Sequence, residues 1–167
     1  NLCIAKSAAR AAGNFLLENK NKNKKIFSEQ GRDIKLEIDR LTEEKITKEL
    51  KKTGIPILGE EFGGGSVSDN SYLWVIDPLD GTSNYFRELD QSCVSIALLN
   101  GTEGLIGVIY NFNTDEMFES AKGMGAFLNE KEIKVSNVTK REKGYLTTGF
   151  PSSCLLYTSP SPRDGIG

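Results

Sequence analysis

Apolar residues in the first third of the chain recur every three or four positions, which is the spacing of one helix face. A first helix is predicted over residues 2–18 and a second over residues 39–52. In the second segment Asp39 is placed to act as the N-cap and Gly54 to end the helix. The apolar stripe of the first segment comprises Ile4, Ala8, Ala11 and Phe15.

Beyond residue 54 the pattern changes to short apolar runs separated by glycine-rich turns, which is typical of β-strands. Residues 100–104 connect two of these runs as a hairpin. Two helices followed by successive hairpins predict an α+β fold, a layered α/β sandwich in which two N-terminal helices pack on a mostly antiparallel sheet. The predicted strands lie at residues 55–58, 72–76, 93–99, 105–110, 117–120, 126–128, 132–135 and 144–150.

The last fifteen residues do not share this pattern. Residues 1–152 form one predicted α+β part, whereas residues 153–167 have neither its spacing nor its composition. They resemble a sequencing adapter translated in one reading frame, and we expect the natural protein to continue differently. The alternative is a genuine Ser/Pro-rich tail.

The absence of histidine among the 167 residues narrows the possible chemistry. It excludes Ser-His-Asp and Cys-His hydrolysis, His-ligated zinc and His-based proton transfer. An enzyme with this composition must rely on carboxylates, hydroxyls, lysines or a bound metal ion.

Charge and cysteine content exclude further classes of partner. The net charge of -2 gives no basic excess for nucleic acid, and no apolar run reaches the length of a membrane span. Cys3, Cys93 and Cys154 are three irregularly spaced cysteines, which do not form a disulfide framework. We therefore expect no nucleic-acid partner, no membrane and a cytoplasmic location.

The segment with the clearest chemistry is residues 74–85. An apolar strand delivers Asp77 to its end, and Asp80 follows across a predicted tight turn. Two carboxylates at this range repel each other, and a hard cation such as Mg2+ would relieve the repulsion. Gly81 allows close backbone approach, and if Gly81 and Thr82 open a helix, its free N–H groups can bind phosphate.

Each of these residues also has an ordinary structural explanation. Asp-Pro and Asp-Gly turns are common, and Asp39 by itself is a helix cap. Glu60 and Glu61, at the end of an earlier apolar run, offer a further carboxylate near a strand end, although paired glutamates are usually only solvated.

Taken together, the segments 33–39, 59–61 and 77–82 resemble the inositol monophosphatase family of Mg2+-dependent phosphatases. Residues 107–110 and 123–127 are similar to the next strands of that family. The resemblance extends to about Phe150 and implies the N-terminal half of the family's sugar-phosphatase fold.

The resemblance also implies a role for each residue of the motif. Glu60, Asp77, the Leu79 carbonyl and Asp80 would bind metal ions, with Asp77 bridging two of them. Asp80, Gly81 and Thr82 would bind the substrate phosphate. Thr82 and Asp39 would orient and deprotonate the attacking water, so that hydrolysis needs no covalent intermediate.

Two departures from the family pattern affect these expectations. Leu36 stands where the family usually has a threonine. The family's C-terminal half, which supplies another metal-binding aspartate and most substrate contacts, has no counterpart after Phe150. We therefore expect the chain by itself to be inactive.

The substrate implied by the resemblance is a small phosphate monoester. The triplet Ser83-Asn84-Tyr85 is closer to the inositol-phosphate branch than to 3'(2'),5'-bisphosphate nucleotidases, and fructose-1,6-bisphosphatase is a third candidate. An alternative of another class is a catalytically inactive module that binds metal or phosphate. Family members often form homodimers, which the complete protein would share.

Overall fold

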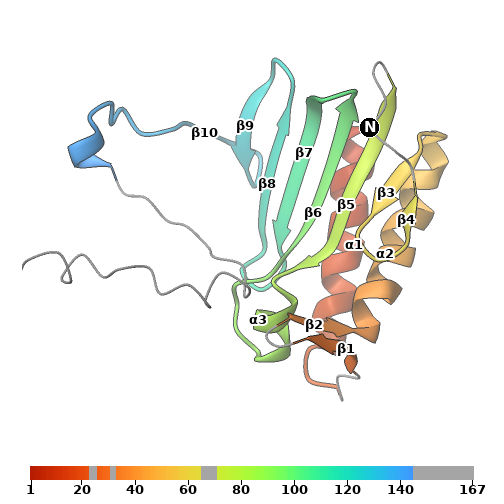
Figure 1. The fold of residues 1–167 in the computed structure, drawn as a ribbon. Helices are drawn as coiled ribbons and strands as arrows, with labels where there is room; N and C mark the ends of the chain where they lie inside the picture. Colours follow the sequence, from red (N-terminus) through yellow and green to blue (C-terminus); the bar gives the residue numbers. More distant parts are fainter. Residues whose placement is uncertain (23–25, 31–32, 65–70, 145–167) are drawn as a thin grey trace, which may run out of the picture.

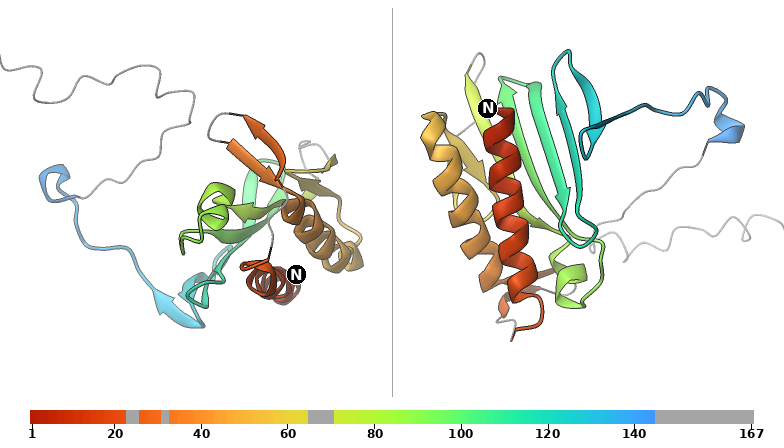
Figure 2. Two further views of the ribbon diagram at one scale, coloured as in Figure 1. Left: turned by 90° about the horizontal axis from the view of Figure 1, so that it is seen from below. Right: turned by 180° about the vertical axis from the view of Figure 1, so that it is seen from behind.

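Two long helices lie side by side on one face of a large sheet (Figure 1). The computed structural model describes residues 1–22, 26–30, 33–64 and 71–144. The helices are α1 (Leu2–Asn19) and α2 (Glu37–Leu50), and α2 continues into a short 3-10 turn, η1 (Lys51–Thr53). The view from behind in Figure 2 shows both helices running across the sheet. This architecture confirms the predicted α+β fold.

The sheet contains eight strands in the order β10-β9-β8-β7-β6-β5-β3-β4. All neighbouring strands are antiparallel except β3 and β5, which run parallel. Its strands are β3 (Ile57–Gly59), β4 (Gly63–Gly64), β5 (Tyr72–Asp80), β6 (Cys93–Asn100), β7 (Glu103–Asn111), β8 (Glu116–Ala121), β9 (Gly125–Leu128) and β10 (Lys131–Ile133).

Three smaller elements complete the described part of the chain. Strands β1 (Ile26–Gln30) and β2 (Asp33–Leu36) form a separate antiparallel hairpin that the sequence analysis did not predict. A one-turn helix, α3 (Thr82–Phe86), follows β5, and η2 (Arg141–Lys143) follows β10. The strand predicted over residues 144–150 and the tail at residues 153–167 fall, apart from Gly144, outside the described residues.

The face of α1 that packs on the sheet differs from the predicted stripe. Of the four predicted residues only Ala8 is buried, and Ala11 is exposed. Small side chains allow the helix to approach the sheet closely, and a Cβ on Gly13 would lie 2.5 Å from the Tyr110 ring. The buried positions of the helix are Ala5, Ala8, Ala9, Ala12, Gly13 and Leu16.

The second helix begins two residues earlier than predicted. Because α2 starts at Glu37, Asp39 lies in its first turn and is not the N-cap. Gly54 has a φ of 70° and ends the 3-10 turn that follows α2, as predicted. No helix in the described ranges has both the length and the hydrophobicity needed to cross a bilayer.

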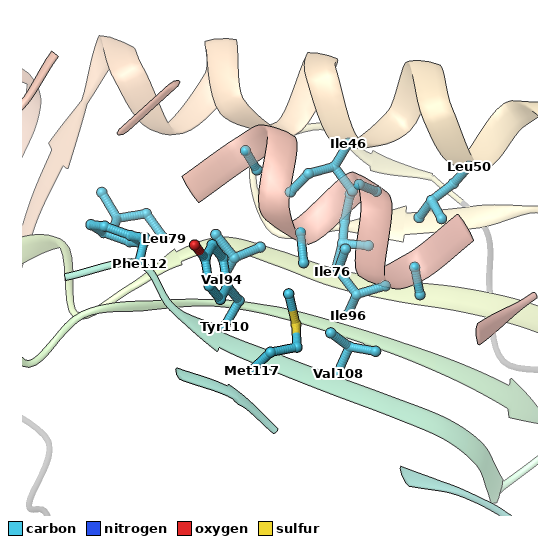
Figure 3. Packing of buried hydrophobic residues seen from close by; sticks show 14 of the residues in the cluster. Ile46, Leu50, Ile76, Leu79, Val94, Ile96, Val108, Tyr110, Phe112 and Met117 are labelled. Carbon is cyan, nitrogen blue, oxygen red and sulfur yellow. The ribbon is translucent and has the colours of Figure 1, made fainter. Parts of the chain in front are cut away.

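The hydrophobic core fills the space between the two helices and the sheet (Figure 3). Trp74 is fully buried there, and its indole N–H donates a hydrogen bond of 3.0 Å to Thr53 Oγ1. This bond ties β5 to η1, the turn that follows α2, so the core fixes the strand that carries the Asp77 motif. Other labelled core residues in Figure 3 include Ile46, Ile76, Val94, Ile96, Val108 and Met117.

Candidate metal and phosphate site

The parallel pairing of β3 with β5 brings Glu60 to Asp77. The register pairs Leu58 with Val75 and Gly59 with Ile76, so the next residues in line are Glu60 and Asp77. Carboxyl ends of parallel strands meet at one edge of a sheet, which is where open α/β sheets place ligands. The two carboxylates therefore lie together although 16 residues separate them in the sequence.

A β-bulge in β5 brings Asp80 onto the same face of the sheet as Asp77. Asp77 pairs with Ser95 and Asp80 with Cys93, so two residues of β5 oppose the single residue Val94. Side chains alternate along a strand, and the extra residue restores Asp80 to the face of Asp77. The predicted tight turn between them is therefore wrong, because β5 continues through Asp80.

Burial and the neighbouring carboxylates Glu60 and Asp80 disfavour the charged form of Asp77. The pKa of Asp77 is raised to about 7, first by burial and then by the charge and hydrogen bonding of Glu60 and the charge of Asp80. The backbone N–H of Leu79 donates to Asp77 Oδ1 at 3.1 Å and acts in the opposite direction. Like charges held at this range are typical of sites that bind a cation.

The donor atoms fit a hard divalent cation by their chemistry. Glu60, Asp77 and Asp80 supply only carboxylate oxygens, which Mg2+ prefers, and their mutual repulsion falls when a cation binds. Within the described residues, no three acidic or cysteine side chains converge closely enough to form a complete metal site. The structure thus brings the predicted ligands together without closing them into a coordination sphere.

Gly81 shapes the backbone that follows the carboxylates. Its φ of 86° lies in the left-handed region, and a Cβ there would lie 2.7 Å from the Gln91 carbonyl oxygen. The helical hydrogen bonds of α3 start with the N–H groups of Asn84 and Tyr85, which donate to Gly81 O. The predicted phosphate-binding amides, those of Gly81 and Thr82, precede these bonds in the chain.

Thr82 begins α3, and Asp39 lies on α2 close enough for its charge to affect Tyr85 of α3. The Thr82 hydroxyl donates a 3.0 Å hydrogen bond to the carbonyl oxygen of Leu79, one of the predicted metal ligands. Asp39 is 2% exposed, and its charge adds to burial in raising the pKa of Tyr85 on α3. Asp39 therefore approaches the site from α2, on the side of α3.

Two residues beside the site were not predicted to contribute. The Glu43 carboxylate on α2 accepts hydrogen bonds from the N–H groups of Glu61 (2.8 Å) and Phe62 (3.1 Å). The Cys93 thiol donates to Asp80 Oδ2 at 3.7 Å, and burial followed by the charge of Asp80 raises its pKa to about 12. For Glu43 the sequence held one signal, its position four residues after Asp39 on the same helix face.

Comparison with known proteins identifies the family. The model of the inositol monophosphatase family matches residues 2–160. The chain belongs to this family. The chain is 42% identical to a protein named Nus factor SuhB from Xylella fastidiosa over 151 residues, which are 88% of this chain and 54% of that one. It is 38% identical to a fructose-1,6-bisphosphatase/inositol-1-monophosphatase from Aquifex aeolicus, covering 89% of this chain and 58% of that one.

Solved structures of the family share the fold. The extragenic suppressor protein suhB from Bartonella henselae matches with a TM-score of 0.75 at 32% identity, over 81% of this chain and 54% of that one. An inositol monophosphatase from Anabaena matches with a TM-score of 0.70 at 37% identity, over 83% of this chain and 50% of that one. The chain thus spans about half the length of the relatives it matches.

Proposed function

We propose that the complete protein is a Mg2+-dependent phosphate monoester hydrolase of the inositol monophosphatase type. The observation that carries the proposal is that Glu60 and Asp80 each lie near Asp77, beside the left-handed turn at Gly81. Membership of a family named for its phosphatase activity supports the same conclusion.

Different residues of the site would bind the metal ion, bind the phosphate and orient the attacking water. Glu60, Asp77, the Leu79 carbonyl and Asp80 would hold Mg2+, which polarises phosphoryl oxygens and lowers the pKa of a bound water. The amides of Gly81 and Thr82 would hold the substrate phosphate. Thr82 and Asp39 would orient the attacking water and accept its proton.

Inositol monophosphate is the substrate that we favour. The residues after Thr82 are Ser83, Asn84 and Tyr85, of which Asn84 donates to Gln91 O at 2.7 Å and Tyr85 is fully buried. These two residues would therefore act on the substrate pocket by fixing the shape of α3 and its loop. The alternatives remain a 3'(2'),5'-bisphosphate nucleotidase and a fructose-1,6-bisphosphatase.

The test is a phosphatase assay on the protein expressed from its complete gene. With Mg2+ present, inositol 1-phosphate should be hydrolysed faster than 3'-phosphoadenosine 5'-phosphate or fructose 1,6-bisphosphate. Asp77→Asn should lower kcat by about 100-fold or more, because changes to residues that only support metal ligands already cost about 10–100-fold in affinity or activity. Glu103→Gln is the control and should keep full activity, because Glu103 begins β7 and pairs with Asn100 at the opposite end of β6 from Cys93. Full activity in Asp77→Asn would refute the proposal.

A second candidate function has no hydrolytic step. Several relatives bear the name Nus factor SuhB, including those of Haemophilus influenzae and Pasteurella multocida. The chain would then bind metal or phosphate and act through a protein partner. Cation binding by the complete protein without turnover of any of the three substrates would favour this function.

We also infer that residues 1–152 are the native α+β part of a longer protein and that residues 153–167 derive from an adapter. The support is the change of composition at residue 153 and the coverage of only about half of each relative. The family match runs to residue 160, so the boundary rests on composition alone. Codons that do not spell the adapter in the source DNA would contradict the inference.

A further inference from the structure

Glu43 is a buried acid that lies beside the candidate site without being one of its predicted ligands. Its side chain is 2% exposed, and both of its oxygens accept backbone hydrogen bonds. A buried carboxylate is costly unless such bonds satisfy it, and bonds from N–H groups to a charged acceptor are among the stronger ones in proteins. Glu43 therefore has a definite partner, which is the backbone of residues 61 and 62.

Gly59 has no side chain, and the Glu43 carboxylate occupies the space where a Cβ of this residue would be. A Cβ built on Gly59 would lie 1.8 Å from Oε1 of Glu43 and 2.4 Å from its Cδ, far inside van der Waals contact. Any other residue at position 59 would displace the Glu43 carboxylate. The glycine at the end of β3 and the glutamate on α2 thus form one mutually dependent contact.

Glu60 lies between the two points where Glu43 touches this segment. Gly59 precedes it and Glu61 follows it, so its backbone is held on both sides. Its own side chain is exposed, and packing therefore does little to fix it. Glu60 shares a hydrogen bond with Asp77, while the negative charges of Asp77 and Asp80 oppose its approach, so the backbone on either side of Glu60 helps to set its position.

Glu43 projects from a helix that is packed on the sheet. Glu43 lies one helical turn beyond Asp39 on the same face of α2, and α2 contacts both β3 and β5. Because α2 is packed on the sheet, Glu43 has a fixed position from which it can hold the segment that carries Glu60.

We propose that Glu43 is a positioning residue that holds the segment 59–62 so that Glu60 faces Asp77 ready to bind a divalent cation. This inference rests on the proposed metal-dependent function. It assigns to Glu43 and Gly59 a role in cation affinity, in addition to any role in stability.

The experiment measures Mn2+ affinity by electron paramagnetic resonance in the protein expressed from its complete gene. Glu43→Gln keeps the side-chain volume but replaces one acceptor oxygen with a donor that faces an N–H group. We expect its Mn2+ dissociation constant to rise by about 10-fold or more, as for other outer-shell residues of metal sites.

Thr42→Val is the matched control. Thr42 is the neighbouring residue on α2, is fully buried, and donates a 2.7 Å hydrogen bond to Ile38 O. Its replacement should lower stability without changing Mn2+ affinity, because its hydroxyl bonds within α2 and not to the amides that Glu43 holds. Equal losses of affinity in both variants would show that Glu43 acts only through stability and would overturn the proposal.

Two further measurements test the proposal without relying on Glu43→Gln. One uses a double variant, and the other uses the unaltered protein. Glu43→Ala and Gly59→Ala break the same contact, so together they should cost no more Mn2+ affinity than the worse of the two alone. In the unaltered metal-free protein, the Glu61 and Phe62 amides should exchange slowly with deuterium. Unprotected exchange of these amides would overturn the proposal even if no variant folds.

The same titration separates this inference from the proposed function. Mn2+ binding without phosphatase activity in the unaltered protein would refute the proposed hydrolysis, while the affinity of Glu43→Gln would still decide the role of Glu43. Tight Mn2+ binding in both the unaltered protein and Glu43→Gln would refute only the positioning role. A complete absence of Mn2+ binding in the unaltered protein would refute both.

Discussion

At the scale of single residues, the site depends on backbone positions that few side chains tolerate. Gly81 combines a left-handed φ with a neighbouring carbonyl where its Cβ would be. Gly59 leaves room for a carboxylate from another element. The sequence predicted a close backbone approach at Gly81, but it gave no sign of the partner of Gly59, because that partner comes from α2.

Gly81→Ala should lower the free energy of unfolding by about 1–3 kcal/mol, since alanine is strained at a φ of 86° and its Cβ would meet the Gln91 backbone. Urea unfolding measures the change. Gly107→Ala is the control, because a Cβ at Gly107 in β7 has no atom within 4 Å. The interpretation fails if Gly81→Ala is no less stable than Gly107→Ala.

Asp115 makes stability depend on pH. Its Oδ1 accepts hydrogen bonds of 2.9 Å from both the Tyr110 hydroxyl and Arg10, and these lower its pKa. A carboxyl group whose pKa is lower in the folded state stabilises the protein above its unfolded pKa of about 3.9, and this contribution is lost as the pH falls further.

Asp115→Asn should therefore lose less stability than the unaltered protein between about pH 5 and about pH 2. Asparagine tolerates the φ of 54° at this position, so the backbone should not change. Urea unfolding at several pH values checks the prediction, with Glu103→Gln as the control. Identical pH dependence in the unaltered protein and in Asp115→Asn would contradict it.

At the scale of elements, the ends of helices and strands are tied by side chains from distant segments. Tyr85 of α3 donates a 2.8 Å hydrogen bond to the Leu16 carbonyl in the last turn of α1. Carbonyls in the last turn of a helix lack helical partners, so this buried phenol satisfies one of them. The bond joins the end of α1 to the element that opens with the predicted phosphate-binding turn.

Tyr85→Phe should lower the free energy of unfolding by about 1–2 kcal/mol, because it leaves the Leu16 carbonyl without its buried donor. Thermal unfolding of the variant measures the loss. Tyr72→Phe is a suitable control, because Tyr72 is an exposed tyrosine at the start of β5. Equal stability of the two variants would show that the Tyr85 hydrogen bond contributes nothing.

Local patterns predicted the helices and most strands from β5 onward to within about two residues. Alternating apolar residues such as Val94, Ile96 and Leu98 pack on the helices, so a period of two is visible in the sequence. The parallel pairing of β3 with β5 and the hairpin of β1 with β2 were not predicted. The β3–β5 pairing depends on partners that no short window of sequence contains, whereas the β1–β2 hairpin is local and was missed.

At the scale of the whole molecule, the two faces of the sheet differ. Helices α1 and α2 cover one face, and Figure 1 is seen from the other. On that other face, Ile109 and Phe118 are cross-strand neighbours in β7 and β8, and they are 47% and 37% exposed. An apolar pair at the centre of an open sheet favours association between chains.

The 167-residue chain should therefore self-associate, and Ile109→Thr combined with Phe118→Thr should reduce this association. Threonine suits a strand but removes much of the apolar surface. Sedimentation velocity measures the change. Leu17→Thr, at an exposed position on α1, is the control and should leave association unchanged. A monomeric unaltered chain would contradict the prediction.

The bulge between Asp77 and Asp80 has a consequence for how the segment can vary in length. Residues three apart in a regular strand face opposite sides of the sheet. The extra residue of the bulge is therefore what places Asp77 and Asp80 on the same side. Deleting one residue there would leave the two carboxylates two positions apart, so a regular strand would still place them on one face and only the bulge would be lost. Pro78, which has no N–H to donate to the ladder, suits the irregular position. Such a deletion would instead change the backbone between the two carboxylates, where the Leu79 N–H donates to Asp77.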